Sequence, residues 1–113
     1  MRKGVSGVDR EPKDSRKQLR REVADAFGAN LKHLREQAGL SQENLSLRAS
    51  LIRTHVGMIE NGERVPGVDT VLRLAGALAV EPGDLFAGIH WQPDDSDRGG
   101  HITDEPPPGA VGS

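Results

Sequence analysis

The residues best suited to chemistry in this sequence lie close together between positions 52 and 61. Four of them fall at the i, i+3, i+4 and i+7 positions of one helical stripe: Thr54, Gly57, Met58 and Asn61. Arg53 flanks this stripe at its leading end. An arginine there can offer two hydrogen-bond donors to guanine O6 and N7, and Thr54 and Met58 can contact the methyl group of thymine. The spacing therefore indicates a helix that contacts base edges in a DNA major groove.

The same stripe has plainer interpretations, which stay open at this point. Arg53 could be a solvated surface residue, and Met58 could be an isolated exposed apolar residue. Gly57 leaves the middle of the stripe without a side chain, so the backbone could approach another surface closely. Val56 and Ile59 fall on the opposite side, where they would pack inward. A helix that faced only solvent would more naturally carry Glu–Lys pairs on its outer stripe, so the residue types favour a partner.

Periodic apolar residues predict the elements that must hold this stripe in place. A first helix covers residues 19–38, where apolar side chains recur every three or four positions, and it ends at Gly39. A second helix begins after the N-cap residue Ser41, and only residues 50–51 separate it from a third. A link this short forces a steep crossing, so the third helix should project from the body.

Two further helices complete the predicted domain. Asp69 caps a fourth helix, and Pro82 begins a fifth helix, which buries Leu85 and Phe86 and ends at Gly88. The predicted fold class is therefore all-α, a compact five-helix bundle. Each helix is too short to persist alone, so shared burial must stabilise them together.

Composition sets the broad class of protein. The 113 residues include no cysteine, so neither disulfides nor thiolate metal sites can support the fold. Aromatic residues make up only 3% of the chain, so the core must consist mainly of Leu, Val, Ile and Ala, which suits packed helices. No run approaches the ~20 apolar residues that span a bilayer, and the N-terminus is charged rather than signal-like. We expect a cytoplasmic protein with no membrane partner.

Polar segments flank the predicted domain of residues 16–92. Residues 1–15 show no apolar period and are expected to form a basic, mobile arm, and residues 93–113 an acidic, Pro/Gly-rich disordered tail. Charge follows a similar division, with a net +4 over residues 1–40, −2 over residues 41–92 and −4 beyond them. The basic arm could track phosphates or enter a minor groove, or it could be a solvated helix start.

A longer pattern surrounds the outer stripe, with the sequence LSQENL…ASLIRTHVGMIENGERVP. Further matching positions stand on either side of it: Asn30-Leu31, Leu34-Arg35, Leu74-Ala75 and Ala77-Leu78. With these residues, the stretch from Phe27 to Ile89 resembles the lambda-repressor/Cro-type family of helix-turn-helix regulators, also called the xenobiotic-response-element (XRE) family. The resemblance implies a lambda-repressor-like DNA-binding domain with its helix-turn-helix at about residues 41–61.

The resemblance also implies roles for individual residues. Phosphate contacts map to Gln42, the first residue after the cap of the second helix, and to Asn61 at the exit of the third. Base contacts map to Arg53, Thr54 and Met58. Three neighbouring polar residues are expected to add phosphate contacts: Ser41, His55 and Arg64.

Several positions depart from the pattern of the family. Ser50 stands where the turn usually has glycine, and a serine in the left-handed conformation costs about 1 kcal/mol. Ile52 stands at the N-cap of the third helix, where a side-chain acceptor is preferred. Either that cap is lost, or Ile52 joins the base contacts by touching a thymine methyl group. Leu47 is apolar where the family is usually charged.

An apolar edge follows the predicted fifth helix. Ile89 and Trp91 lie just beyond it, and an exposed tryptophan is costly in a monomer but useful at a partner surface. Because members of the family commonly pair through their last helix, the resemblance implies a homodimer. We expect four residues in its interface: Leu85, Phe86, Ile89 and Trp91. Alternatively, Trp91 folds back and closes the small core.

These observations predict a sequence-specific transcriptional regulator that binds double-stranded DNA, a homodimeric repressor on a two-fold operator. A phage-type repressor, a controller of a restriction system and an antitoxin all stay open. The alternative is a protein-interaction module that uses the third helix or the Ile89–Trp91 edge, and the net −2 charge of residues 41–92 favours it. No catalytic constellation stands out, and no pair of histidines has i, i+4 ligand spacing. We therefore expect no enzyme activity, metal, cofactor or small-molecule effector.

Overall fold

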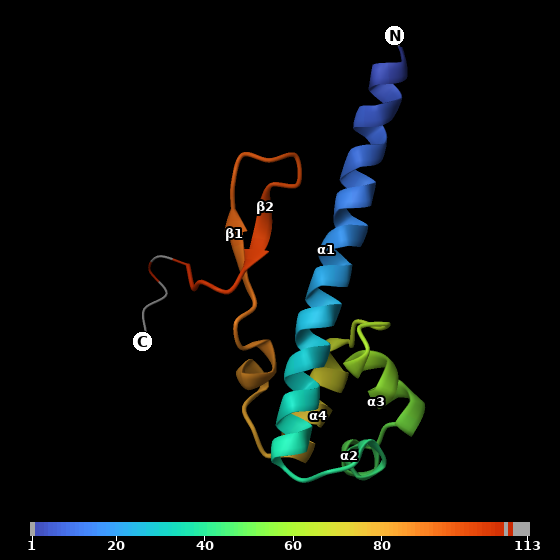
Figure 1. The fold of residues 1–113 in the computed structure, drawn as a ribbon, viewed down its shortest axis with the longest axis vertical. Coiled ribbons are helices and arrows are strands. Elements are labelled where there is room, and N and C mark those ends of the chain that lie inside the picture. Colours follow the sequence, from blue (N-terminus) through green and yellow to red (C-terminus); the bar gives the residue numbers. More distant parts are fainter. Residues whose placement is uncertain (1, 108, 110–113) are drawn as a thin grey trace. The chain divides into compact units, whose positions relative to one another are not determined.

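The computed structural model describes residues 2–107 and 109, with side chains from residue 16 onward. Its elements follow in chain order: α1 (Arg2–Gln37), α2 (Gln42–Ala49), α3 (Arg53–Glu60), α4 (Val68–Leu78), the 3-10 helix η1 (Pro82–Phe86), β1 (His90–Pro93) and β2 (Gly100–Thr103) (Figure 1). Packing divides the chain into two units. We call Val23–Ala87 the helical unit, and the residues up to Glu22 together with those from Gly88 the hairpin unit.

Apolar residues at helical spacing form the core of the helical unit. The largest fully buried side chains come from every one of its helices: Phe27, Leu31, Leu45, Val56, Ile59, Leu74 and Leu85. α2 packs against both α3 and α4, and α4 packs against η1. Because helices of eight residues are marginal alone, this shared burial stabilises α2 and α3.

The expected five-helix bundle is wrong in its last element. Within the described residues the structure has four α-helices, and the segment that begins at Pro82 forms the short 3-10 helix η1. The carboxylate of Asp84 accepts a hydrogen bond from the backbone N–H of Glu81 at 3.0 Å, which closes a tight first turn. The chain then leaves the helical conformation at Ala87 (φ −57°, ψ 129°). The five residues from Pro82 to Phe86 are too few to propagate an α-helix.

The hairpin unit contains an antiparallel β1–β2 pair, which differs from the disordered tail expected for residues 93–113. Trp91 lies opposite Ile102 in the register, and an aromatic residue paired with a β-branched one stabilises a hairpin. A Cβ at Gly100 would stand 2.5 Å from Trp91 Cζ2, so only glycine leaves room for the tryptophan ring.

The turn of this hairpin is rich in acidic residues. Asp94 accepts a hydrogen bond from the backbone N–H of Ser96 at 2.8 Å, and its other carboxylate oxygen lies 2.7 Å from Nδ1 of His101. The hydrogen bonds with Ser96 and then His101 lower the pKa of Asp94 to about 2. Arg98 Nη2 lies 3.3 Å from Glu22 Oε1, which ties the turn to α1 within the same unit.

α1 differs from the expectation at its N-terminal end. Residues 1–15 were expected to form a mobile arm, but the chain is helical from Arg2. Extension of a helix that is already nucleated adds a backbone hydrogen bond for each residue, so the helix can continue without apolar periodicity. Across the described residues, no helix combines the length and the apolar character needed to cross a membrane.

Candidate nucleic-acid interface

Ser41 caps α2, as the sequence predicts. Its Oγ accepts a hydrogen bond from the backbone N–H of Asn44 at 3.0 Å. Leu45 and Ala49 are buried and anchor the inner side of α2 in the core. Since the first backbone N–H groups of a helix have no partner within it, the capped end of α2 carries donors and a partial positive charge.

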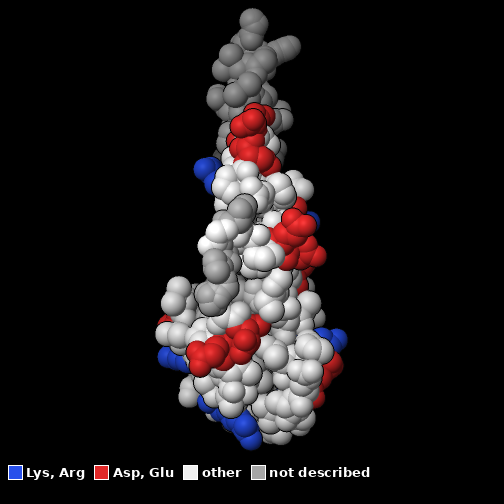
Figure 2. All heavy atoms as spheres, turned by 90° about the vertical axis from the view of Figure 1, so that its left-hand side faces the viewer, with Lys and Arg blue, Asp and Glu red and all other residues white. Residues whose placement is uncertain are grey.

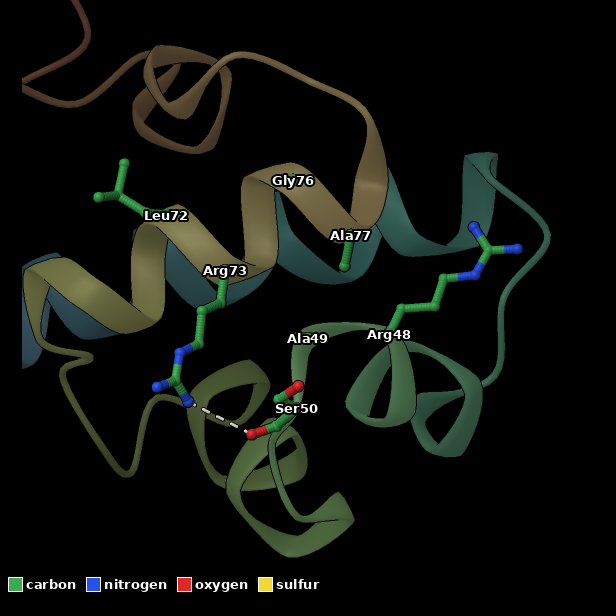
Figure 3. A pocket seen from close by; sticks show the side chains of 7 residues that line it. All are labelled: Arg48, Ala49, Ser50, Leu72, Arg73, Gly76 and Ala77. Atoms are coloured by element: carbon green, nitrogen blue, oxygen red, sulfur yellow. Dashed lines mark hydrogen bonds between the residues drawn. The ribbon is translucent and has the colours of Figure 1, made fainter.

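The turn between α2 and α3 is held by a residue in the left-handed conformation. Ser50 has φ 58° and ψ 44°, which confirms the strain predicted at this position. The next residue, Leu51, returns its N–H to the carbonyl of Ser46 at 2.8 Å, so the chain reverses within three residues. Arg73 Nη1 donates to the carbonyl of Ser50 at 3.3 Å (Figure 3). This role of Arg73 was not predicted from the sequence.

α3 turns its apolar side inward and its predicted contact residues outward. Val56 and Ile59 are completely buried, as expected. Arg53 and Thr54 are exposed, and Met58 is half-buried. The three side chains predicted to contact bases therefore lie outside the core.

A small pocket forms beside the N-terminal half of α3. It encloses about 130 Å³ and is lined by five residues that the sequence analysis had assigned to bases or phosphates: Ile52, Thr54, His55, Met58 and Arg64. Arg64 reaches it from the loop that follows α3. Ile52 occupies the N-cap position of α3 without a side-chain hydrogen bond, so the side-chain cap is absent, while the alternative of a contact between Ile52 and a thymine methyl group stays a prediction.

A buried ion pair joins the three helices around the turn. Glu60, whose side chain is only 1% exposed, accepts hydrogen bonds from Arg35 Nε at 2.6 Å and Arg35 Nη2 at 3.0 Å. Arg35 Nη1 also donates to the carbonyl of Leu40 at 2.9 Å, and Gln42 Nε2 donates to Glu60 Oε1 at 3.0 Å. The hydrogen bond with Glu60 raises the pKa of Arg35. The ends of α1 and α3 and the start of α2 thus share one polar network.

This network was not predicted from the sequence. One signal could have revealed it. Glu60 follows the inward residue Val56 by four positions, so helical spacing turns it toward the core as well. A carboxylate on the inner side of a helix needs a cationic partner, and Arg35 was the arginine within the family-like segment of the first helix.

Two glycines bring neighbouring elements close to α3. A Cβ at Gly28 would collide with the carbonyl oxygens of Ile59 and Glu60, so α1 crosses the C-terminal end of α3 at close range. A Cβ at Gly57 would stand 3.6 Å from Gln42 Oε1. Gly57 therefore faces the side chain of Gln42, and the expected close approach of its backbone to a partner surface stays a prediction.

The four residues expected at a homodimer interface are divided between the two units, with Leu85 and Phe86 in the helical unit. Leu85 is completely buried in the helical unit, which removes it from any contact with a partner. Phe86 is 41% exposed, although its ring centroid lies 5.2 Å from that of Phe27 in an edge-to-face contact. Ile89 and Trp91 belong to the hairpin unit, where Trp91 is partly exposed and Ile89 half-buried.

A second hollow, of about 330 Å³, lies between α2 and α4 (Figure 3). Its lining includes Arg48 from α2 and Arg73 and Leu72 from α4. Figure 3 shows the side chain of Arg73 directed toward Ser50 and that of Arg48 extending away from it. The two arginines therefore do not converge on one anion.

Charge is distributed in separate patches. On the face shown in Figure 2, acidic side chains gather in several larger areas and basic side chains in smaller ones between them. Among the side chains described on this face, the basic ones do not form a continuous surface that would follow a phosphate backbone. Among the described residues, no group of three His, Asp or Glu side chains is arranged to hold a metal ion.

Comparison with known proteins gives consistent matches over the helical unit. A family model described as a helix-turn-helix domain matches residues 26–87. Control protein C.BamHI of Bacillus amyloliquefaciens is 35% identical over 61 residues, which cover 53% of this chain and 75% of that protein. The uncharacterized HTH-type transcriptional regulator y4dJ of Sinorhizobium fredii (strain NBRC 101917 / NGR234) is 36% identical over 58 residues, or 51% of this chain and 75% of that protein.

A solved structure agrees with these matches. The restriction-modification controller protein C.AhdI from Aeromonas hydrophila superposes with a TM-score of 0.55 at 43% sequence identity, over 56% of this chain and 96% of that chain. The predicted family resemblance and mostly helical fold are confirmed. The comparisons support DNA-binding transcriptional regulation as the function.

Proposed function

Since the chain belongs to the helix-turn-helix domain family, we propose that it is a sequence-specific transcriptional regulator, a homodimeric repressor that binds a two-fold operator. The observation that carries this proposal is the orientation of α3. Val56 and Ile59 anchor the helix in the core, while Arg53 and Thr54 extend from its N-terminal end into solvent. A helix anchored in this way can enter a major groove without unfolding any part of the domain.

Base recognition is assigned to the exposed end of α3. Arg53 can donate two hydrogen bonds to O6 and N7 of a guanine, and such a bidentate pair discriminates against other bases by about 1–3 kcal/mol. Thr54 and Met58 lie on the same outer stripe and can contact neighbouring bases. These contacts select sequence, whereas contacts to the backbone set the register of the protein on the duplex.

Phosphate contacts are assigned to the start of α2 and to the exit of α3. Gln42 uses its amide nitrogen to bind Glu60, but an amide nitrogen carries two hydrogens, so a second donor can point to a phosphate. Ser41 and Asn61 are exposed at these helix ends, and the dipole at the start of α2 favours an anion there. His55 and Arg64 lie beside the small pocket and complete the proposed set.

Two copies would contact the two halves of an operator. Recognition helices of two-fold proteins enter half-sites about one helical turn, or ~34 Å, apart. The proposed interface uses Phe86 and Trp91, because large apolar side chains that stay partly exposed in one copy gain most from a partner surface, together with the half-buried Ile89. A bound dimer that overlaps a promoter would block RNA polymerase. The names of the relatives favour a controller of a restriction–modification system among the three settings left open above.

A protein-interaction module is the second candidate, because several large apolar side chains of the helical unit are exposed. Leu47, Val68 and Leu72 are each more than half exposed, and none of them belongs to the proposed DNA-contacting set. Such side chains could serve a protein partner instead of a duplex. Salt dependence separates the two candidates, since displacement of counterions from phosphates makes DNA affinity fall steeply with added salt.

The test is a titration of fluorescently labelled duplexes, selected from a random library with the full chain, at several salt concentrations. A DNA-binding protein should lose affinity with a log–log slope of about 0.9 for each phosphate that it neutralises. Lys32→Ala, which removes an exposed cation on α1 outside the proposed interface, is the control that should leave affinity unchanged. Failure to enrich any duplex, or a complex insensitive to salt, would contradict the proposal.

A further inference from the structure

The pocket beside α3 has a size that excludes ordinary small-molecule ligands. Its volume is about 130 Å³, whereas pockets for such ligands usually enclose about 300–1,000 Å³. A water molecule takes about 30 Å³ of the liquid, and a methyl group is of similar size. The pocket can therefore hold a methyl group together with the edge of the ring that carries it, but little more.

The chemistry of the pocket wall is apolar on one side and cationic or polar on the other. Ile52, Met58 and the methyl group of Thr54 supply the apolar part. Arg64 supplies permanent N–H donors, and His55 adds an imidazole ring. A fitting group is thus a small apolar substituent that stands next to a hydrogen-bond acceptor or a phosphate.

Ile52 is the residue that the fold itself does not explain. It occupies the N-cap of α3, where a serine, threonine, asparagine or aspartate would satisfy a free N–H group of the first turn. Its side chain makes no such bond, and 71% of the residue is exposed. An isoleucine at this position therefore weakens the helix without contributing to the core, and a role in contact with a ligand accounts for it.

We infer that this pocket receives the 5-methyl group of a thymine in the major groove. This inference rests on the proposed function and adds to it a specific base and the side chains that select it. Thymine presents its methyl group beside the O4 acceptor. That arrangement matches apolar walls next to the donors of Thr54 and of Arg64, whose guanidinium keeps further N–H groups for the phosphate contact proposed above.

The same chemistry distinguishes thymine from 5-methylcytosine. In 5-methylcytosine the neighbour of the methyl group is the N4 amino group, which is a donor. The guanidinium of Arg64 has donors and no acceptor, so it cannot bind that amino group. The hydroxyl of Thr54 could accept from that amino group, but Arg64 would still face it donor to donor, so the pocket favours thymine over 5-methylcytosine.

The experiment begins with the duplex that the full chain selects from a random library. Each thymine of one half-site is then replaced in turn by deoxyuridine, which differs only by the absence of the 5-methyl group. Burial of one methyl-sized group predicts a loss of affinity of about three- to fivefold at one position and little change at the others. Replacement of the same thymine by 5-methylcytosine, with guanine opposite, should not restore the affinity.

Ile52→Ser is the decisive variant, because it removes the apolar wall while it supplies the missing cap. It should raise the melting temperature of the helical unit, yet it should bind the thymine and deoxyuridine duplexes almost equally. Leu47→Ser is the matched control, since Leu47 is also 70% exposed but lies on α2 outside the pocket. That control should keep the three- to fivefold preference for thymine. Met58→Ala should reduce the preference through a different wall of the pocket.

The possible outcomes separate the inference from the proposed function. If the full chain binds duplexes in a salt-sensitive way but no thymine responds to deoxyuridine, the pocket assignment is overturned and the regulator proposal stands. An Ile52→Ser variant that retains the full preference for thymine also overturns it. If no salt-sensitive complex forms with any duplex, both fail together.

Discussion

Removal of Arg35 should destabilise the helical unit far more than the loss of a surface arginine. The side chain of Arg35 is 11% exposed and that of Glu60 is 1% exposed, so Arg35→Ala would leave a carboxylate almost fully buried without its charged partner. Loss of one member of a buried pair costs about 3–5 kcal/mol. A domain has only about 5–15 kcal/mol of stability, so this single change should consume a large part of it.

Urea denaturation followed by the circular dichroism of the helices measures this loss. The same cost should lower the melting temperature by more than about 10 °C in a domain of this size. Arg48→Ala, which removes an exposed arginine at the end of α2, is the control and should change stability by less than about 0.5 kcal/mol. Gln42 cannot replace Arg35, because its amide offers Glu60 a neutral donor.

A double variant distinguishes the cost of an unpaired charge from the cost of lost packing. In Arg35→Met combined with Glu60→Leu, no charge remains buried, so stability should return to within about 1 kcal/mol of the original chain or exceed it. The reasoning is refuted if Arg35→Ala costs less than about 1 kcal/mol. It is also refuted if the double variant is as unstable as the single one.

Four further predictions concern the site and the hairpin. Arg53→Ala should weaken duplex binding by about 1–3 kcal/mol and relax the preference at one operator position, whereas Gln42→Ala should weaken binding to all duplexes alike. Selection of duplexes from a random library with each variant checks both predictions. An unchanged motif for Arg53→Ala, or a changed motif for Gln42→Ala, would contradict the assigned roles. Ser50→Gly should raise the free energy of unfolding by about 1 kcal/mol in urea denaturation, because glycine adopts a φ of 58° without strain, and an unchanged midpoint would argue against strain at the turn. Asp94 has its pKa lowered from 3.8 to about 2, so its contribution to the hairpin is fully present above pH 4 and is lost as the pH falls through about 2. Fluorescence of Trp91, the single tryptophan of the chain, should report this transition. The transition near pH 2 should be absent in the Asp94→Asn variant.

The helix-turn-helix could be predicted because its signals are local. The spacing of Val56 and Ile59 is enough to indicate the inner side of α3, and the outer stripe follows from the same helical period. Ser41 is recognisable as a cap from its type and position, and the strain at Ser50 was expected because the family resemblance places a glycine there. Each of these features depends on residues a few positions apart, which a sequence displays directly.

The features that escaped prediction depend on partners distant in the chain. The buried side chain of Glu60 makes sense only with Arg35, which lies 25 residues earlier. The hairpin depends on Trp91 opposite Ile102 and on the space that Gly100 leaves for the ring, but the acidic turn between them resembles a disordered segment in composition. The segment from Pro82 was predicted as an α-helix because the spacing of apolar residues does not distinguish a short α-helix from a short 3-10 helix.

The close crossing at Gly28 has a consequence for how such a protein could change its target. The close packing of α1 at Gly28 fixes the C-terminal end of α3, whereas the side chains of residues 52–54 at the other end are exposed and lie outside the core. Substitutions at those three positions can therefore accumulate during evolution without loss of the fold. A lineage could acquire new operators by exchanging them, while the anchored end of the helix stayed constant.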